Sequence, residues 1–258
     1  MTQVEVKTRI PYTVEIGHGL LASAGERVRA VCGGETAAVV SDDTVFSLYG
    51  AALCTQLEGA GYRVVPFVFP HGEASKNLST YAELVNFLAE KRLTRTDVLV
   101  ALGGGVTGDL GGFAAATYLR GIRYVQVPTT LLAAVDSSVG GKTAVDLPAG
   151  KNLAGCFHQP SIVLCDLDTL ATLPDDTFRD GCAEVIKYGM IDNAEFLRQL
   201  SETPAREQLE HVVTTCVRMK RDVVSEDEFD RGRRQLLNFG HTFGHAVEAC
   251  SRFAVSHG

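Results

Sequence analysis

The sequence predicts an α/β domain followed by a mostly α-helical domain. Short apolar segments alternate with helical patterns through residues 37–109. This alternation is typical of a parallel sheet with helices on both faces and ligands at the carboxyl ends of its strands. Beyond about Leu173, helical spacing continues to His257 with few strand candidates. The 258 residues, 45% of them hydrophobic, are enough for one large or two ordinary domains. We therefore predict domains at 1–173 and 174–258.

The predicted strands follow from alternation and from short apolar runs. Alternating Val4, Val6, Thr8 and Ile10 predict a strand at the N-terminus. Later apolar runs are bounded by turn residues and are too short for typical helices. They predict three further strands, at residues 37–41, 63–69 and 97–102.

Helical patterns connect these strands and continue after them. Residues 44–59 have helical spacing. Thr80 and Glu83 have the spacing of a capping box, for a helix that runs to about Lys91. In the second half, Pro174–Asp176 is typical of a helix start, since proline suits the first helical position.

Composition argues against several classes of protein. The net charge of -7 argues against general nucleic-acid binding, although a local cluster of cations can still hold an anionic small molecule. No apolar run approaches membrane-spanning length, and the N-terminus has no signal-peptide pattern. The seven cysteines are an odd number without Cys-x-x-Cys spacing, which argues against a disulfide framework and against a thiolate zinc site. We therefore expect a cytoplasmic protein.

Two glycine-rich segments are candidate anion sites. Gly103–Gly108 satisfies G-x-G-x-x-G between a predicted strand and a predicted helix, where backbone N–H groups can reach a pyrophosphate. It lies outside the first strand–helix unit, and no acidic residue ends a following strand about twenty residues on, so a structural tight turn is the alternative. Gly-Gly-Lys-Thr at 140–143 resembles the end of a P-loop, but Asp136 replaces the upstream glycine, which argues against an ATPase. A mobile glycine turn that presents Lys142 to an anion remains.

Two charged segments have a chemical and an ordinary interpretation. His71–Lys76 places Glu73 and Lys76 in a turn after a strand, where they could meet ribose hydroxyls or phosphate. A solvated charged turn is the alternative. Glu184 and Lys187 lie at i and i+3 of a predicted helix, and the alternative there is an ordinary surface ion pair.

The segment Asn238–His245 reads Asn-Phe-Gly-His-Thr-Phe-Gly-His. In a helix, His241 and His245 lie on one face, with Asn238 one turn earlier, and the two glycines leave room for a close approach. The segment lacks the glutamate that makes His-Glu-x-x-His specific, so two histidines on a solvated helix face are the alternative. A carboxylate and two imidazoles with an open fourth position are typical of catalytic zinc.

Taken together, these segments resemble one family, 3-dehydroquinate synthase, the cyclase of the shikimate pathway. The shared motifs occur in order over residues 72–258: Gly-Glu-Ala-Ser-Lys, Leu-Gly-Gly-Gly-Val-x-Gly-Asp, Pro-Thr-Thr, Val-Asp-Ser-Ser-Val-Gly-Gly-Lys-Thr, Lys-Asn, Ala-Glu-Val-Ile-Lys, Asn-Phe-Gly-His-Thr-Phe-Gly-His and a closing His-Gly. The resemblance implies a Rossmann-like dinucleotide-binding domain followed by a mostly α-helical metal- and substrate-binding domain. Family members continue with a further helical segment, so a fragment or a C-terminal truncation is expected.

The resemblance also implies the site residues. The ligands of Zn²⁺ (or Co²⁺) would be Glu184, His241 and His257. NAD would lie along Asp42, His71, Gly72, Glu73, Ala74, Ser75, Lys76, Gly104, Gly105, Val106, Thr107, Gly108, Asp109, Thr129, Thr130, Lys142, Lys151, Thr169, Leu170, Ala171 and Thr172. The substrate pocket would hold Asp136, Lys142, Asn152, Lys187, Lys220, Arg234, Asn238 and His245, and Arg120 would come from the partner in a homodimer.

The implied activity is that of a NAD- and divalent-metal-dependent carbon–oxygen lyase. It converts 3-deoxy-D-arabino-heptulosonate 7-phosphate to 3-dehydroquinate. NAD transiently oxidises a ring alcohol, which acidifies the adjacent C–H; phosphate is eliminated, the hydride returns, and the opened ring closes by an aldol step. Zinc would act as a Lewis acid. Lys142, Asn152 and His245 would hold the phosphate and Arg234 the carboxylate, while the substrate phosphate can act as its own base.

Three alternatives remain at this level. Other sugar phosphate cyclases share the chemistry but act on substrates without the carboxylate; Lys220, Arg234, Asn238 and His245 favour the dehydroquinate branch. A metal-dependent polyol dehydrogenase of the same fold is a second alternative, but such an enzyme needs neither residues that bind a phosphate nor a residue that binds a carboxylate. A truncated, catalytically dead homologue would act only as a binding protein.

Overall fold

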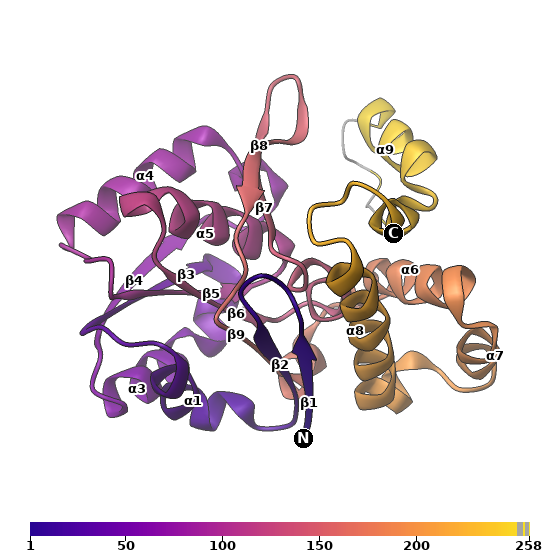
Figure 1. Ribbon diagram of the computed structural model, residues 1–258, viewed down its shortest axis with the longest axis horizontal. Helices are drawn as coiled ribbons and strands as arrows, with labels where there is room; N and C mark the ends of the chain where they lie inside the picture. Colours follow the sequence, from indigo (N-terminus) through magenta and orange to yellow (C-terminus); the bar gives the residue numbers. More distant parts are fainter. Residues whose placement is uncertain (252–254, 256–257) are drawn as a thin grey trace.

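A seven-stranded sheet forms the centre of the N-terminal part of the chain (Figure 1). The computed structural model describes residues 1–251, 255 and 258. The strand order is β1-β2-β9-β6-β5-β3-β4, with β1 and β2 antiparallel and all other neighbours parallel. The strands are β1 (Thr2–Val6), β2 (Tyr12–Gly17), β3 (Thr36–Asp42), β4 (Arg63–Phe69), β5 (Val98–Gly103), β6 (Arg123–Pro128) and β9 (Ile162–Asp166).

Helices cover both faces of this sheet. Figure 1 shows α1 (Ala24–Val31) and α3 (Ala51–Gly59) on one face, and α4 (Leu78–Glu90) and α5 (Gly105–Thr117) on the other. Two hydrophobic clusters fill these interfaces, one around Leu53 and Leu57, the other around Leu84, Leu88 and Leu110. Strand β5 is buried along its whole length because it is covered on both sides, which explains its continuous apolar sequence.

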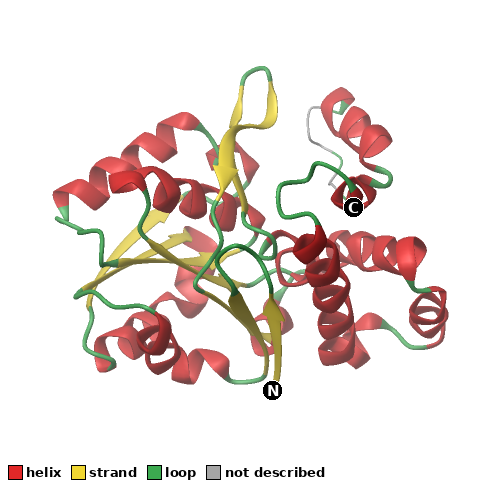
Figure 2. Ribbon diagram, in the orientation of Figure 1, coloured by secondary structure: helices red, strands yellow, loops and turns green. Residues whose placement is uncertain are grey.

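A β-hairpin and a helical part complete the molecule. Strands β7 (Lys142–Leu147) and β8 (Gly150–Phe157) form an antiparallel hairpin that projects from the α/β part (Figure 2). From Asp175 onward the described chain is helical, with α6 (Asp175–Asp192), α7 (Ala194–Glu202), α8 (Leu209–Glu226) and α9 (His241–Cys250). No helix among the described residues is both long enough and apolar enough to cross a membrane.

The predicted strands 37–41, 63–69 and 97–102 and the helix start at Asp175 are confirmed within a residue. The capping box is wrong: α4 begins at Leu78, and the Asn77 side chain caps it by accepting from the N–H groups of Ser79 and Thr80. The N-terminal strand ends at Val6, before the predicted Thr8 and Ile10. The helical segment 44–59 is interrupted by a π-helical turn at Phe46–Gly50, and the hairpin was not predicted.

The histidine-rich segment is two helices rather than one. A 3₁₀ helix (Arg233–Asn238) ends before Gly240, whose φ of +84° breaks the chain direction, and α9 then begins at His241. Asn238 therefore does not lie one helical turn before His241. A Cβ at Gly240 or Gly244 would meet nothing within 4 Å, so no other part of the described chain packs closely against either glycine, and Gly240 serves the turn.

One hydrophobic cluster connects the two parts of the chain. It joins β1 and β2, through residues such as Val14 and Ile16, with buried residues of α6 and α8 such as Tyr188 and Val217. Helix α8 packs directly on the β1–β2 pair (Figure 1). The domain boundary after Leu173 stays a prediction, and the shared core means that a cut there would expose apolar surface on both sides.

Candidate active site

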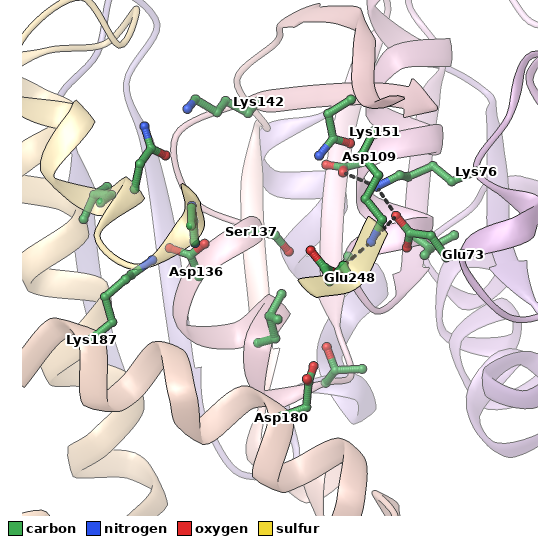
Figure 3. Close-up of a pocket in the computed structure, with 18 of the residues that line it drawn as sticks. Glu73, Lys76, Asp109, Asp136, Ser137, Lys142, Lys151, Asp180, Lys187 and Glu248 are labelled. Atoms are coloured by element: carbon green, nitrogen blue, oxygen red, sulfur yellow. Dashed lines mark hydrogen bonds and ion pairs between the residues drawn. The ribbon is translucent and has the colours of Figure 1, made fainter. Parts of the chain in front are cut away.

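A cleft of about 520 Å³ lies between the carboxyl ends of the central strands, the β7–β8 hairpin and the helical part. Figure 3 shows side chains from both parts of the chain pointing into it. Many of the predicted site residues line it: Glu73, Lys76, Gly105, Val106, Asp109, Thr130, Asp136, Lys142, Lys151, Asn152, Lys187, Lys220, Arg234, Asn238 and His241. Folding therefore brings together residues that are up to 168 positions apart, from Glu73 to His241.

The glycine-rich turn lies where β5 passes into α5. A Cβ at Gly103 would overlap with the Thr107 side chain, whereas one at Gly105 would be at ordinary contact distance, 3.4 Å, from Ser137 Oγ. Gly105 and Ser137 both line the cleft. Within the described chain the buried Ser137 Oγ has no hydrogen-bond partner, so this wall offers an unused polar group to a ligand. The strand, turn and helix start together fit a dinucleotide pyrophosphate.

Lys76 is the centre of a buried charge cluster. Its Nζ lies 2.8 Å from Glu73 Oε1, 3.4 Å from Asp109 Oδ2 and 3.7 Å from Asp146 Oδ1. The Lys76 side chain is buried, which excludes the solvated charged turn considered for this segment. Burial raises the pKa of Asp109 to about 6, although Lys76 opposes this shift. Burial would also raise the pKa of Glu73, but the charge and hydrogen bond of Lys76, together with the charge of Lys151, outweigh burial and lower that pKa.

We expect Asp109→Asn to change how stability depends on pH. The pKa of Asp109 is about 6 in the folded protein against an ordinary 3.8, so the stability from its protonated form is complete below pH 3.8 and is lost as pH rises to 6. Asparagine does not titrate, so the variant does not lose stability through residue 109 as the pH rises. Relative to wild type, its free energy of unfolding should rise by up to about 3 kcal/mol between pH 4 and pH 7. Urea denaturation without NAD measures this, and a constant difference between the two proteins would contradict it.

Asp136 is held by two groups from the helical part. The Tyr188 hydroxyl donates to Asp136 Oδ1 at 2.5 Å, and Lys220 Nζ lies 2.9 Å from the same oxygen and 2.6 Å from the Asp136 carbonyl oxygen. Burial would raise the pKa of Asp136, but the charges of Lys220 and Lys187 outweigh it and lower that pKa. Burial lowers the pKa of Lys220 to about 8. Lys220 can therefore release a proton more readily than an ordinary lysine.

Glu184 forms an ion pair with Lys187 and approaches His241. Both Glu184 and Lys187 are buried, at 5% and 6% exposure, so the surface ion pair considered for this spacing is excluded. His241 Nε2 lies 3.4 Å from Glu184 Oε1. A buried carboxylate beside an imidazole fits a zinc site in its donor chemistry. The described residues contain no cluster of three or more potential metal ligands; the third predicted ligand, His257, lies outside the described residues.

Arg234 is buried where the helical part meets the Gly140 turn. Its Nη2 donates to the Gly140 carbonyl oxygen at 2.9 Å and its Nη1 to the Glu228 carbonyl oxygen at 2.6 Å. Lys142 follows this turn, two residues after Gly140; it is exposed and forms an ion pair with Asp230. The cleft thus holds a buried guanidinium together with an ammonium at its mouth. This combination suits a ligand that carries two separate anionic groups.

The remaining predicted residues lie outside the lining of the cleft. Asp42 ends β3, His71, Gly72, Ala74 and Ser75 follow β4, and Thr169, Leu170, Ala171 and Thr172 belong to a 3₁₀ helix after β9, all at the carboxyl edge of the sheet. Gly104 precedes α5, Thr107 and Gly108 lie in its first turn, and Thr129 follows β6. Arg120 lies beyond the far end of α5, at the opposite edge. His245 belongs to α9, but its side chain lies outside what the structure describes.

Sequence reasoning missed several lining residues. Glu248 is buried and lies 3.0 Å from Lys151 Nζ, which in turn lies 3.6 Å from Glu73 (Figure 3). Ser137 and Asp180 also line the cleft, and Asp146 and Asp230 pair with its lysines. Glu248 is seven residues after His241, close to two helical turns, so helical periodicity could have placed it on the same face. The sequence around Asp146, Asp180 and Asp230 has no comparable pattern that would have placed them at the site.

Two adjoining family models match the chain. One describes the N-terminal part of 3-dehydroquinate synthase and matches residues 66–180, and the other describes the C-terminal part and matches residues 181–258. The chain is 53% identical to the 3-dehydroquinate synthase of Caulobacter vibrioides over 257 residues, which is 96% of this chain and 69% of the relative. It is 48% identical to that of Clostridium acetobutylicum over 241 residues, 92% of this chain and 68% of the relative.

Solved structures of related enzymes have the same fold. A 2-deoxy-scyllo-inosose synthase in complex with carbaglucose-6-phosphate, NAD⁺ and Co²⁺ is 30% identical, with a TM-score of 0.90 over 99% of this chain and 72% of that chain. A 2-epi-5-epi-valiolone synthase from Streptomyces hygroscopicus with NAD⁺ and Zn²⁺ is also 30% identical, with a TM-score of 0.86 over 99% and 73%. An iron-containing alcohol dehydrogenase, at 15% identity and a TM-score of 0.71, shares the fold alone.

Proposed function

The chain belongs to the 3-dehydroquinate synthase family, and from that premise we propose that its cleft converts 3-deoxy-D-arabino-heptulosonate 7-phosphate to 3-dehydroquinate and phosphate. One observation supports this most strongly: a single cleft is lined by a glycine turn at a helix start, by the His241 imidazole that lies beside the buried Glu184 carboxylate, and by separate cations for two anionic groups. The reaction is a carbon–oxygen elimination in the biosynthesis of chorismate and aromatic amino acids.

We assign the two anionic groups of the substrate to different cations. Lys142 and Asn152, at the start of β7 and in β8, are exposed on the hairpin and can take the phosphate. Arg234 is buried beside the Gly140 turn that precedes Lys142, and its planar guanidinium suits a carboxylate. Asn238, at the end of the 3₁₀ helix beside Arg234, lines the same wall. Lys142 pairs with Asp230 in this structure, so the incoming phosphate has to replace that carboxylate.

The charged groups around Asp136 can stabilise charge that develops on the substrate at the centre of the cleft. Asp136 holds Lys220 by two contacts. The charge of Lys187 also helps to lower the pKa of Asp136. Because its pKa is lowered to about 8, Lys220 can stabilise a developing negative charge on a substrate oxygen by donating a hydrogen bond. We assign no single general base, since the substrate phosphate can remove the proton itself.

Two groups that the chain would bind complete the proposal. Glu184 and His241, with His257, would hold Zn²⁺ or Co²⁺, which supplies Lewis-acid polarisation of the substrate hydroxyls. The turn at Gly104 and Gly105 would hold the NAD pyrophosphate, and NAD supplies transient oxidation of a ring alcohol. Lys76 fixes Glu73 beside this turn, where the carboxylate can accept from ribose hydroxyls. The homodimer, the place of Arg120 in the partner's site and the cytoplasmic location stay predictions.

Phosphate release tests this assignment. The protein loaded with zinc and NAD should release phosphate from the heptulosonate phosphate, and a chelator should stop the release. We expect Lys142→Ala to lower kcat/KM by about 100-fold, mainly through KM, because a charged partner of the phosphate is lost. Lys91→Ala, an exposed lysine on the far end of α4, is the control and should leave kcat/KM unchanged. Retained kcat/KM in Lys142→Ala would remove Lys142 from this role.

A further inference from the structure

Tyr12 connects the N-terminal strands to the cleft. It begins β2, where it pairs with Val6 of β1, and it is only 4% exposed. Its phenolic oxygen accepts a hydrogen bond from the Gly140 N–H at 2.9 Å. Gly140 belongs to the turn that precedes Lys142, so a residue of the N-terminal hairpin fixes a peptide at the wall of the cleft, 128 positions away.

Arg234 holds the backbone of Gly140 at its carbonyl group. The Gly140 carbonyl oxygen accepts from Arg234 Nη2 at 2.9 Å. Gly140 has a φ of +95°, and a Cβ there would overlap with Arg234 Nη2 and lie 2.8 Å from a Val224 methyl group. Both the conformation and the space therefore require glycine. The position of the Arg234 guanidinium therefore depends on the backbone of Gly140, and Tyr12 anchors that backbone.

Arg234 has few other restraints that set its direction. Its second contact is from Nη1 to the Glu228 carbonyl oxygen at 2.6 Å, and the guanidinium carbon lies 5.7 Å from the centre of the Phe157 ring. No carboxylate of the described chain forms an ion pair with it, although the side chain is only 2% exposed. A buried guanidinium held by neutral carbonyls is arranged to receive an anionic group from a ligand.

We propose that Tyr12 is a positioning residue: it fixes the Gly140 peptide and thereby aims the Arg234 guanidinium at the carboxylate of the substrate. This inference rests on the proposed function, because it takes Arg234 as the group that binds the carboxylate. Tyr12 does not line the cleft, and its effect passes through two hydrogen bonds of 2.9 Å, one to the N–H and one to the carbonyl oxygen of Gly140.

A purely structural tyrosine gives the matched control. The Tyr118 hydroxyl also forms one hydrogen bond to the main chain, but as a donor: it donates to the Leu93 carbonyl oxygen at 2.9 Å, in the cluster between the sheet and α4 and α5. Tyr12→Phe and Tyr118→Phe each remove one buried hydroxyl and one hydrogen bond to the main chain. Any general loss of stability should therefore be similar in the two variants.

Steady-state phosphate release by the zinc- and NAD-loaded enzyme separates the two roles. We expect Tyr12→Phe to raise KM about tenfold with kcat changed less than about twofold, because the carboxylate contact is lost equally from substrate and transition state. Tyr118→Phe should keep the wild-type KM. A merely structural Tyr12 would lower the amount of active enzyme and so kcat, with KM unchanged, and that result would overturn the proposal.

Direct binding provides a test that does not need turnover. The probes are a phosphonate analogue of the substrate, which cannot release phosphate, and the same analogue with hydroxymethyl in place of the carboxylate. Calorimetry should show Tyr12→Phe and Gly140→Ala weakening the first probe about tenfold and leaving the second unchanged. Arg234→Ala should weaken binding of the first probe by at least the same factor. If Arg234→Ala weakens neither probe selectively, the assignment of the carboxylate is wrong; if it does and Tyr12→Phe does not, only the positioning role is wrong.

Discussion

Glu184→Gln should lower the free energy of unfolding of the metal-free protein by about 3–5 kcal/mol. Glu184 is the carboxylate that pairs with the buried Lys187, and both side chains are nearly inaccessible to solvent. Glutamine keeps the shape but removes the charge, so Lys187 would remain buried without its ion-pair partner. Zinc binding should also weaken by about 100-fold or more, since a proposed ligand loses its charge. Chemical denaturation and zinc titration measure the two effects.

A double variant separates these two roles of Glu184. In Glu184→Gln/Lys187→Met the buried ammonium is gone, so most of the lost stability should return. Zinc affinity should stay low, because the ligand is still missing. Glu195→Gln is the control: Glu195 is an exposed acid that also pairs with a cation at i+3, and its change should cost less than about 0.5 kcal/mol. Recovery of zinc binding in the double variant would show that Glu184 is only a structural partner of Lys187.

Lys76→Met should have an effect of similar size in the other half of the cleft. Lys76 is the buried, shared cation of Glu73, Asp109 and Asp146, and methionine leaves three half-buried carboxylates close together. Of these three, Glu73 keeps a second lysine, Lys151, at 3.6 Å. We expect a loss of about 3–5 kcal/mol at pH 7 and a weaker affinity for NAD, because Glu73 is no longer fixed beside the glycine turn.

The pH dependence of this variant gives a second test. Removing Lys76 raises the folded-state pKa of the carboxylates around it, and stability from a raised pKa is present at low pH and lost as pH rises through it. The difference in the free energy of unfolding between Lys76→Met and wild type should therefore be large at pH 7 and smaller at pH 4. Lys91→Met, an exposed lysine over the Phe87 ring, should change stability by less than about 0.5 kcal/mol at either pH. A Lys76→Met protein within 1 kcal/mol of wild type at pH 7 would show that the cluster needs no central cation.

Local sequence patterns predicted four of the seven strands of the central sheet, β1, β3, β4 and β5, but not β2, β6 or β9. Strands β3, β4 and β5 are short apolar runs with turn residues on both sides, and such runs are hydrophobic because both faces of a parallel sheet are covered. The hairpin of β7 and β8 was missed because only some of its residues are buried and its strands lack a clear alternation. The break at Gly240 was missed because the spacing of His241 and His245 suggested a longer helix.

The candidate site was predicted in part by local chemistry and in part by resemblance. Spacing alone left Lys76, Glu184 and Lys187 with an ordinary surface interpretation, and only burial in the fold excludes it. Glu248 and Asp230 were not foreseen, because each is a single acid in a helical or loop context. Their partners, Lys151 and Lys142, lie 97 and 88 positions away.

The sequence by itself determined the class of the fold, the glycine turn between β5 and α5, and the family to which the chain belongs. These depend on periodicity and on ordered motifs, which are properties of neighbouring residues. The tertiary structure alone decided which charges are buried and which share a partner, because desolvation and Coulomb interactions depend on distances between segments that are remote along the chain. Lys76 with three carboxylates, and Tyr12 with the Gly140 peptide and Arg234, are arrangements of this second kind.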